Sequence, residues 1–563
     1  MLRNTGCLGL VLGCSLLTLG CDDGQTPEDS GPPRVDAGPA EPVFVACEDT
    51  DPGAPLSGVQ STLEASVAVP ARLADAPNAN PASERGELMY RAMGLGEVSA
   101  GPPIARMTRD DLGTASATGS SRRSIAWFAH YSDFQLVDDE SPLRLAGTDN
   151  PSIGGGLRAQ EAYLPRAVSA MNRTVTRIVA PDRPLDFGMI TGDCADSGQA
   201  NELRWVIELM NGAPGLHTDS GVDDDPLPGP GNDPKDPFDP VAFPAPWYYV
   251  PGNHDLLIVG ITLPDDVARM RAIGTTPIGS TRSYTRRWGG LTNQEIPADP
   301  ERRLVDRMDI VATLLADDAG PGPVGHGYVG PVDVSHGANY EVDVIPGVLR
   351  LIALDTTDDT GGSSGLVHRG TVEEFLVPAL ERATTDGVLA ILASHHSTTS
   401  IDTMSGEIGG TVVPDAVPPA ELESIVAGYA NAVAWFVGHS HDRRVRAIAG
   451  PDADHPGYWE IMSPAIADYP GQARLVEIVD NGDGTISIYT TLIDFDESDC
   501  MEQRYRRLMV MEWASGWADR VSDAPEDLNV ELVRPIPASS SMVATIAGAT
   551  GHDRIESETT LAP

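Results

Sequence analysis

The chain has 563 residues and a formal net charge of −44, because 82 acidic side chains outnumber 38 basic ones. A surface this acidic repels polyanions, and the sequence contains no basic stripe. We therefore exclude nucleic acid as a partner. A hydrophobic content of 41% supports a substantial core. The length allows one large α/β domain with additions, or two domains.

The first 21 residues predict export. Arg3 precedes an apolar run from Cys7 to Leu19, which is too short for a transmembrane helix and is typical of a secretory signal. Residues 17–21 resemble a bacterial lipobox, with Thr18 where leucine is usual. This resemblance implies that Cys21 is lipidated and begins the mature protein; cleavage without lipidation is the alternative. No other span has the length and apolarity of a membrane helix. We therefore expect a periplasmic or cell-surface protein held to the membrane only by its N-terminal lipid.

Two stretches are rich in Asp, Pro and Gly and lack hydrophobic periodicity. Residues 22–60 predict a flexible tether. The stretch from Asp219 to Pro246 predicts a long exposed loop, which we place over the entrance of the candidate site described below.

Between and after these stretches, apolar runs alternate with helical patterns. We expect strands at 124–131, 185–190, 247–250, 349–354, 388–393 and 433–437, and helices at 200–210, 371–384 and 418–430. Asn481 to Gly484 predicts a hairpin turn between strands 473–479 and 485–491. One further helix is expected at 504–517, followed by a loose tail.

Five short segments, each after an apolar run, carry residue types that bind metals. In chain order they are Ser132-Asp133-Phe134-Gln135, Gly192-Asp193, Gly252-Asn253-His254-Asp255, Ser394-His395-His396 and Gly438-His439-Ser440-His441. Open α/β sheets place their ligands at the carboxyl ends of strands, where these segments would lie.

The order of the segments resembles the calcineurin-like metallophosphoesterase superfamily, whose pattern is D-x-H, G-D, G-N-H-[DE], H and G-H-x-H. The resemblance spans roughly residues 125 to 445, and four of the five segments match. It implies an α/β fold in which a two-sheet β-sandwich is flanked by helices. Together with the signal peptide at 1–21 and the tether at 22–60, we expect a catalytic domain at 61–500 and a C-terminal helix and tail at 501–563.

The resemblance further implies two divalent or mixed-valence metal ions, for which Mn, Fe and Zn are the favoured identities. One would bind Asp133, Gln135, Asp193 and His441, and the other Asp193, Asn253, His395 and His439. A carboxylate shared by two cations holds them about 3.5–4 Å apart, and the pair makes hydroxide available near neutral pH. In the family mechanism, this hydroxide attacks phosphorus while the residue at His254 assists the leaving group. We expect Asp255 to orient His254 through a hydrogen bond.

Three positions depart from the simple pattern or leave alternatives. Gln135 stands where the family most often has histidine, and its amide is a weaker donor than imidazole. The cluster Asp138-Asp139-Glu140 could supply a replacement carboxylate, although a solvated acidic loop is the favoured interpretation. Asp196 stands where purple acid phosphatases have tyrosine, so a charge-transfer Fe(III) site is not expected.

The remaining chemically active residues have plainer interpretations. His396 would point away from the ligands, because neighbouring side chains in an extended segment face opposite sides. We leave five histidines out of the site: His130, His217, His326, His336 and His368. Arg443 and Arg444 either help an anionic substrate to approach or form a solvated pair. Cys47 and Cys500 could pair in an oxidising compartment, and Cys194 is interpreted as a small buried residue.

These observations predict a metal-dependent phosphoric ester hydrolase that acts on a small phosphomonoester or phosphodiester. The alternative from another class is a non-catalytic surface protein that binds metal or a partner on the same fold. The sequence leaves the choice of ester, the metal and the oligomeric state open.

Overall fold

The computed structural model describes residues 56–553 apart from 60, 76, 78, 80, 82, 115–121, 145–158, 180–182, 280, 286–288, 331, 407–409, 519 and 550–551. The signal segment with Cys21 lies outside the described residues, as does nearly all of the tether. Within the described ranges, no helix is long and apolar enough to cross a membrane.

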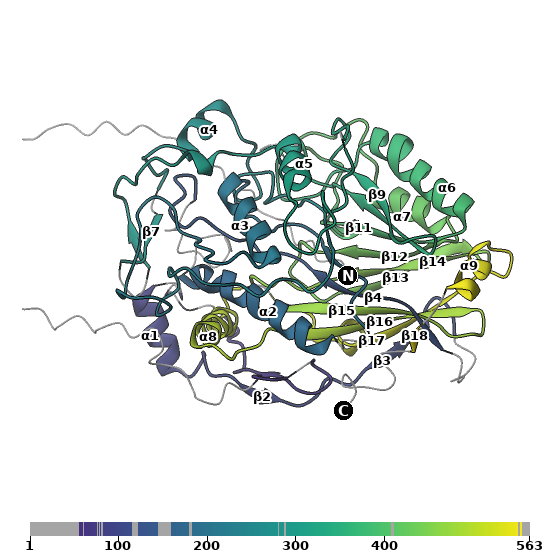
Figure 1. The fold of residues 1–563 in the computed structure, drawn as a ribbon, viewed down its shortest axis with the longest axis horizontal. Helices are drawn as coiled ribbons and strands as arrows, with labels where there is room; N and C mark the ends of the chain where they lie inside the picture. Colours follow the sequence, from purple (N-terminus) through teal and green to yellow (C-terminus); the bar gives the residue numbers. More distant parts are fainter. Residues whose placement is uncertain are drawn as a thin grey trace, which may run out of the picture.

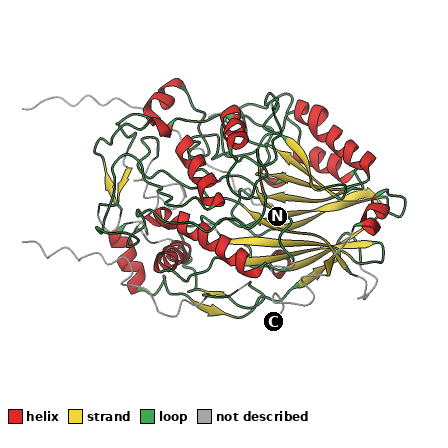
Figure 2. Ribbon diagram, viewed as in Figure 1, coloured by secondary structure: helices red, strands yellow, loops and turns green. Residues whose placement is uncertain are grey.

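Two multi-stranded sheets form the centre of the molecule (Figure 1), and the helices lie around them (Figure 2). This architecture confirms the predicted α/β class with two sheets flanked by helices. The larger sheet has the order β3 (Met107–Arg109), β17 (Val530–Pro535), β16 (Thr485–Asp494), β15 (Gln472–Asp480), β4 (Arg123–Tyr131), β5 (Phe187–Ile190) and β6 (Trp247–Tyr249), and β18 (His552–Asp553) also pairs with β4.

The second sheet has the order β13 (Val445–Asp452), β14 (His455–Met462), β12 (Ala432–Val437), β11 (Leu389–Ser394), β10 (Leu349–Leu354) and β9 (Tyr340–Ile345). Two small two-stranded sheets pair β1 (Ser66–Ala68) with β2 (Ser99–Gly101) and β7 (Thr281–Ser283) with β8 (Gly290–Thr292).

The helices are α1 (Glu84–Ala92), α2 (Leu164–Ile178), α3 (Ala200–Asn211), α4 (Asp266–Ala272), α5 (Arg307–Ala316), α6 (Val377–Asp386), α7 (Pro419–Ala427), α8 (Cys500–Ser515) and α9 (Met542–Gly548). Helix α6 contacts β11, and α7 contacts β13 and β14, so both cover the second sheet. Helix α2 contacts β16 of the larger sheet and also packs against α8.

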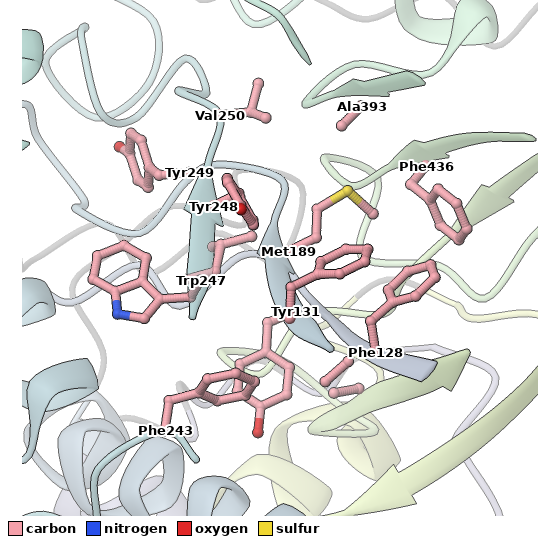
Figure 3. Packing of buried hydrophobic residues seen from close by; sticks show 14 of the residues in the cluster. Phe128, Tyr131, Met189, Phe243, Trp247, Tyr248, Tyr249, Val250, Ala393 and Phe436 are labelled. Carbon is pink, nitrogen blue, oxygen red and sulfur yellow. The ribbon is translucent and has the colours of Figure 1, made fainter. Parts of the chain in front are cut away.

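The core lies between the two sheets (Figure 3). The ring of Phe128 on β4 meets the ring of Phe436 on β12 edge to face, with centroids 5.4 Å apart. Ile391 of β11 also belongs to this core, whereas the next residue, Leu392, packs in a second cluster with α6 and α7. Both faces of these central strands are therefore buried, which explains their continuous apolar runs.

The parallel pairings align the ends of the strands that carry the motifs. β4, β5 and β6 are parallel neighbours in one sheet, and β11 and β12 are parallel neighbours in the other. Each of the five segments begins at the carboxyl end of one of these strands or within three residues after it. The predicted strands and helices in this region occur within a few residues of their expected bounds.

Two expectations about the rest of the chain are wrong. The segment after α8 is not a loose tail, because Val530–Pro535 forms β17 between β16 and β3, and its Val530 and Leu532 are buried in the core. The stretch 219–246 has no helix or strand, as expected, but it is not simply exposed. Its Asp233 and Lys235 are buried, and Lys235 Nζ pairs with Asp139 Oδ1 at 2.5 Å and Asp219 Oδ1 at 2.9 Å.

Candidate metal centre

The turns that follow the motif strands hold their polar residues in an uncommon backbone conformation. In the described part of the chain, seven residues other than glycine have a positive φ, and five of them are proposed ligands: Asp133, Gln135, Asp193, His439 and His441. Each such residue costs of order 1–3 kcal/mol, and such strain clusters at functional sites. The fold therefore holds these five side chains together at an energetic cost.

Close contacts between the turns need glycine. A Cβ on Gly252 would lie 2.2 Å from Asp193 Oδ1, so only glycine lets the β6 turn approach the β5 turn. The β4 and β5 turns are also tied together, because Asp133 N donates to Gly192 O at 3.0 Å and Gln135 N donates to Asp193 O at 2.8 Å.

Asp133, Asp193 and His395 form the buried centre of the site, with ligand atoms all within 4.8 Å of one another. His395 Nε2 lies 3.0 Å from Asp193 Oδ2 and 4.0 Å from Asp133 Oδ1. His439 Nδ1 lies 3.3 Å from His395 Nε2. Two carboxylates and two imidazoles thus converge, although they come from four strands in two sheets.

The other two predicted first-metal ligands lie beside Asp133. His441 Nε2 is 3.3 Å from Asp133 Oδ1, and Gln135 Nε2 is 3.4 Å from His441 Nε2. The sequence predicted this neighbourhood. The Gln135 amide can turn either its nitrogen or its oxygen towards the site by rotating about its last side-chain bond.

Asn253 carries the clearest sign that a cation belongs here. Its Nδ2 donates to Gly260 O at 2.9 Å, which fixes the amide orientation. Its Oδ1 is buried and has no hydrogen-bond partner among the described residues. A buried acceptor without a donor costs about 1–3 kcal/mol, and a divalent cation beside Asp193 and His395 would satisfy it. The donor set of carboxylate, amide and imidazole suits Mn, Fe or Zn.

Two ligand imidazoles are oriented from behind. His395 Nδ1 donates to Thr191 O at 2.7 Å, and His441 Nδ1 lies 2.5 Å from Asp468 Oδ2. In both rings the Nε2 atom is left facing the site. Partners of this kind fix the tautomer and raise the basicity of a metal-binding histidine. Sequence reasoning missed Asp468, because it lies 27 residues after His441 and belongs to no motif.

His254 sits at the edge of the same cluster, with its side chain 18% exposed. Its backbone N donates to Asp193 Oδ1 at 2.8 Å, and its Nδ1 donates to Asp196 O at 2.6 Å. The carbonyl of Asp196, not the carboxylate of Asp255, therefore orients the ring through Nδ1.

The expected hydrogen bond between Asp255 and His254 is therefore wrong, because Asp255 has other partners. Its carboxylate accepts hydrogen bonds from the backbone N–H groups of Asp193, Cys194, Ala195 and Gly252 at 2.7–2.9 Å. Asp255 thus shapes the turn that presents Asp193, and it acts on the site through the backbone.

The charges of the cluster shift the pKa values of its members. Burial alone would raise the pKa of Asp193, but His395 and His254 hold it far below its usual range. Burial alone would lower the pKa of His395, but Asp193 and Asp133 raise it to about 9. Burial and the charge of His395 lower the pKa of His439 to about 3. The cluster therefore keeps Asp193 ionised, which is the state that binds cations.

Several other sequence interpretations can be compared with the structure. His130 is fully buried beside Phe436 and lies in the core, as expected. His396 is buried, with Nδ1 2.9 Å from Thr356 Oγ1 and Nε2 3.2 Å from Ser363 O. The His396 ring lies against His439, and one of its nitrogens is within 4.8 Å of the ligand atoms of His395 and His439. Both of its nitrogens are nevertheless occupied by the contacts with Thr356 and Ser363. Cys194 is buried and free, as expected.

The acidic run Asp138-Asp139-Glu140 is buried, and the expectation of a solvated loop is wrong. Asp138 Oδ2 accepts from Asn201 Nδ2 at 2.7 Å, and Asp139 pairs with Lys235. Burial, followed by the charge of Asp139, raises the pKa of Glu140 to about 9. The run is held by its own partners, away from the ligand cluster.

The arginines after the last motif are both engaged. Arg443 pairs with Asp523 at 2.7 Å, and Arg444 pairs with Asp442 at 3.2 Å. Cys500 is disulfide-bonded, and its expected partner Cys47 lies outside the described residues.

No protein-family model and no curated protein match this chain. Among solved structures, a dimetal phosphatase from Danio rerio aligns with 66% of this chain and 99% of its own at 11% identity and a TM-score of 0.32. A purple acid phosphatase from yellow lupin seeds aligns with 70% of this chain and 55% of its own at 10% identity and a TM-score of 0.28. At TM-scores this low, the case for a metal centre rests on the residues of this chain.

Proposed function

We propose that the protein is a metal-dependent phosphoric ester hydrolase with a dinuclear centre. The observation that carries the proposal is the convergence of Asp133, Asp193, His395 and His439. Asn253 precedes the residue whose N–H binds Asp193, and its buried Oδ1 has no donor among the described residues. Asp193 would be shared between two cations. Gln135 and His441 would complete the first position.

Each protein group has a defined task in such a reaction. Bound divalent cations would activate a water molecule and neutralise the phosphate oxygens. Asp193 is kept ionised and in place by His395 and by the backbone of His254. His254, held through Nδ1 by the carbonyl of Asp196, presents Nε2 to donate a proton to the departing alkoxide. Asp255 keeps the turn around Asp193 in its strained conformation.

The test is hydrolysis of p-nitrophenyl phosphate and bis-p-nitrophenyl phosphate by metal-stripped protein resupplied with Mn, Fe, Zn, Mg or Ca. We expect turnover that depends on the added metal and is lost in Asp193→Ala and Asn253→Ala. Asn172→Ala is the matched control, because Asn172 is also fully buried, donates to a carbonyl and has an unpartnered Oδ1, but lies on α2. No turnover with any metal would contradict the proposal.

Gln135 is the observation that favours the alternative, a binding protein without turnover, because an amide replaces an imidazole at the first metal position. In the enzyme, Gln135→His is expected to tighten the first metal and to keep or raise activity. If both forms bind metal and neither turns over any ester, the non-catalytic function is supported.

A further inference from the structure

An apolar surface begins where the metal centre ends. Gly260 packs directly on the His254 and Asn253 side chains, so a Cβ there would lie 2.4 Å from His254 Nε2. The next residues of the same segment turn large apolar side chains to solvent, with Ile261 54% and Leu263 42% exposed. Ile261 directly follows the glycine that touches His254, the residue proposed to assist the departing alcohol.

A second segment completes this surface and also starts at the site. Ser363 O accepts from His396 Nε2 at 3.2 Å, and the preceding Gly362 donates its N–H to Ile261 O at 2.7 Å. Gly406 N donates to Asp358 Oδ2 at 3.1 Å, so the segment that contains Met404, 39% exposed, lies against residues 358–362. Ile261, Leu263 and Met404 are called the apolar rim below.

The negative charge of these segments disfavours alcohols that are themselves negatively charged. Residues 259–263, 358–363 and 402–406 contain no lysine or arginine, and they contain Asp358, Asp359 and Asp402. An alcohol that carries further phosphates, as in a sugar bisphosphate or a nucleoside triphosphate, would bring additional anions against these carboxylates. An uncharged, apolar alcohol would instead cover side chains that are otherwise in water.

We propose that the substrate is an amphiphilic phosphate ester, whose phosphate lies at the metal centre and whose apolar alcohol lies on the rim of Ile261, Leu263 and Met404. The inference rests on the proposed hydrolase function and adds the substrate class. The alcohol is an alkyl chain or an aromatic ring, and both share the apolar character that the rim recognises. Each methylene covered by the rim favours binding about fourfold.

The test uses an ester series measured below micelle concentrations with the metal-loaded protein. Ethyl, butyl, hexyl and octyl phosphate form one arm, phenyl and 2-naphthyl phosphate a second, and the corresponding methyl diesters a third. We expect kcat/KM to rise at least 30-fold from the ethyl to the octyl ester, or from the phenyl to the naphthyl ester. The arm with the steeper rise identifies the alcohol.

The double variant Ile261→Ser, Leu263→Ser is expected to flatten this rise at least fivefold. Leu88→Ser is the matched control, because Leu88 is 50% exposed but lies on α1. The ratio between two esters does not depend on the fraction of folded enzyme. Turnover without dependence on the alcohol, or an equal rise in the double variant, would overturn the rim while leaving the hydrolase intact.

Binding provides an arm that needs no turnover. Octylphosphonate is expected to bind the Mn-loaded protein at least tenfold more tightly than ethylphosphonate by calorimetry, and the double variant is expected to lose that difference. If no ester is hydrolysed, the hydrolase proposal fails, and the phosphonate comparison still decides whether the rim binds an apolar group. Equal affinities for the two phosphonates would overturn it.

Discussion

The carboxylate of Asp468 is expected to control how tightly the first metal position binds. Asp468 Oδ2 lies 2.5 Å from His441 Nδ1, so it fixes the tautomer in which Nε2 faces Asp133. This contact has special weight here, because the neighbouring Gln135 offers an amide, which is a weaker donor than an imidazole. Loss of such a partner typically weakens metal affinity 10–100-fold. We therefore expect Asp468→Asn to weaken one of two metal sites by about that factor and to leave the other unchanged.

The measurement is a calorimetric titration of the metal-stripped protein with Mn²⁺. Asp317→Asn is the matched control, because Asp317 Oδ2 lies 2.8 Å from His326 Nε2 in an equivalent pair outside the cluster. The side chains of His441 and Asp468 are 20% and 22% exposed, so the substitution does not leave His441 as an unpaired charge in a fully buried position. Identical affinities at both sites in wild type and Asp468→Asn would refute the reasoning, as would an equal loss in Asp317→Asn.

Two further predictions rest on contacts in the structure, and a third rests on the N-terminal sequence. Glu140 has a folded-state pKa of about 9, raised by burial above its ordinary 4.5, so its contribution to stability is full below pH 4.5 and is lost as pH rises towards 9. Glu140→Gln is expected to remove this loss of unfolding free energy, which is worth up to about 6 kcal/mol. The measurement is urea unfolding of wild type and variant at pH 5 and pH 9, and the same pH dependence in both proteins would show that this is wrong. Gly260→Ala is expected to lower kcat at least tenfold, because its Cβ would meet His254. Gly215→Ala is the control, because Gly215 also has a positive φ but a Cβ there would have nothing within 4 Å. Equal effects of the two substitutions on kcat would refute the importance of the contact. Cys21→Ala is expected to abolish labelling by radioactive palmitate and release the protein from membranes, and unchanged membrane association would contradict a lipid anchor.

The sequence predicted well those features that repeat along a strand or sit within one motif. The apolar runs before Asp133, Asp193, Asn253, His395 and His439 are the parallel strands that deliver these residues to one edge of two sheets. Burial of both strand faces produces such continuous apolar runs.

Contacts between distant segments were not readable in the same way. Asp255 could be seen beside His254, but only the folded turn shows that four backbone donors occupy its carboxylate. The acidic run at Asp139 looked like a surface loop because its cation, Lys235, lies 96 residues away. Strand β17 was missed because Glu531 and Arg534 interrupt its apolar residues, so that it shows no continuous apolar run. It gains its stability from pairing with β16 and β3.

The most direct test of the dinuclear centre is electron paramagnetic resonance of the Mn²⁺-loaded protein, together with a count of bound Mn²⁺. Two cations sharing Asp193 would lie about 3.5–4 Å apart and couple magnetically. We expect two Mn²⁺ per chain with a spin-coupled signal in the wild type, and loss of the coupling in Asp193→Ala. Fewer than two bound ions, or only the uncoupled signal of isolated Mn²⁺, would contradict the account.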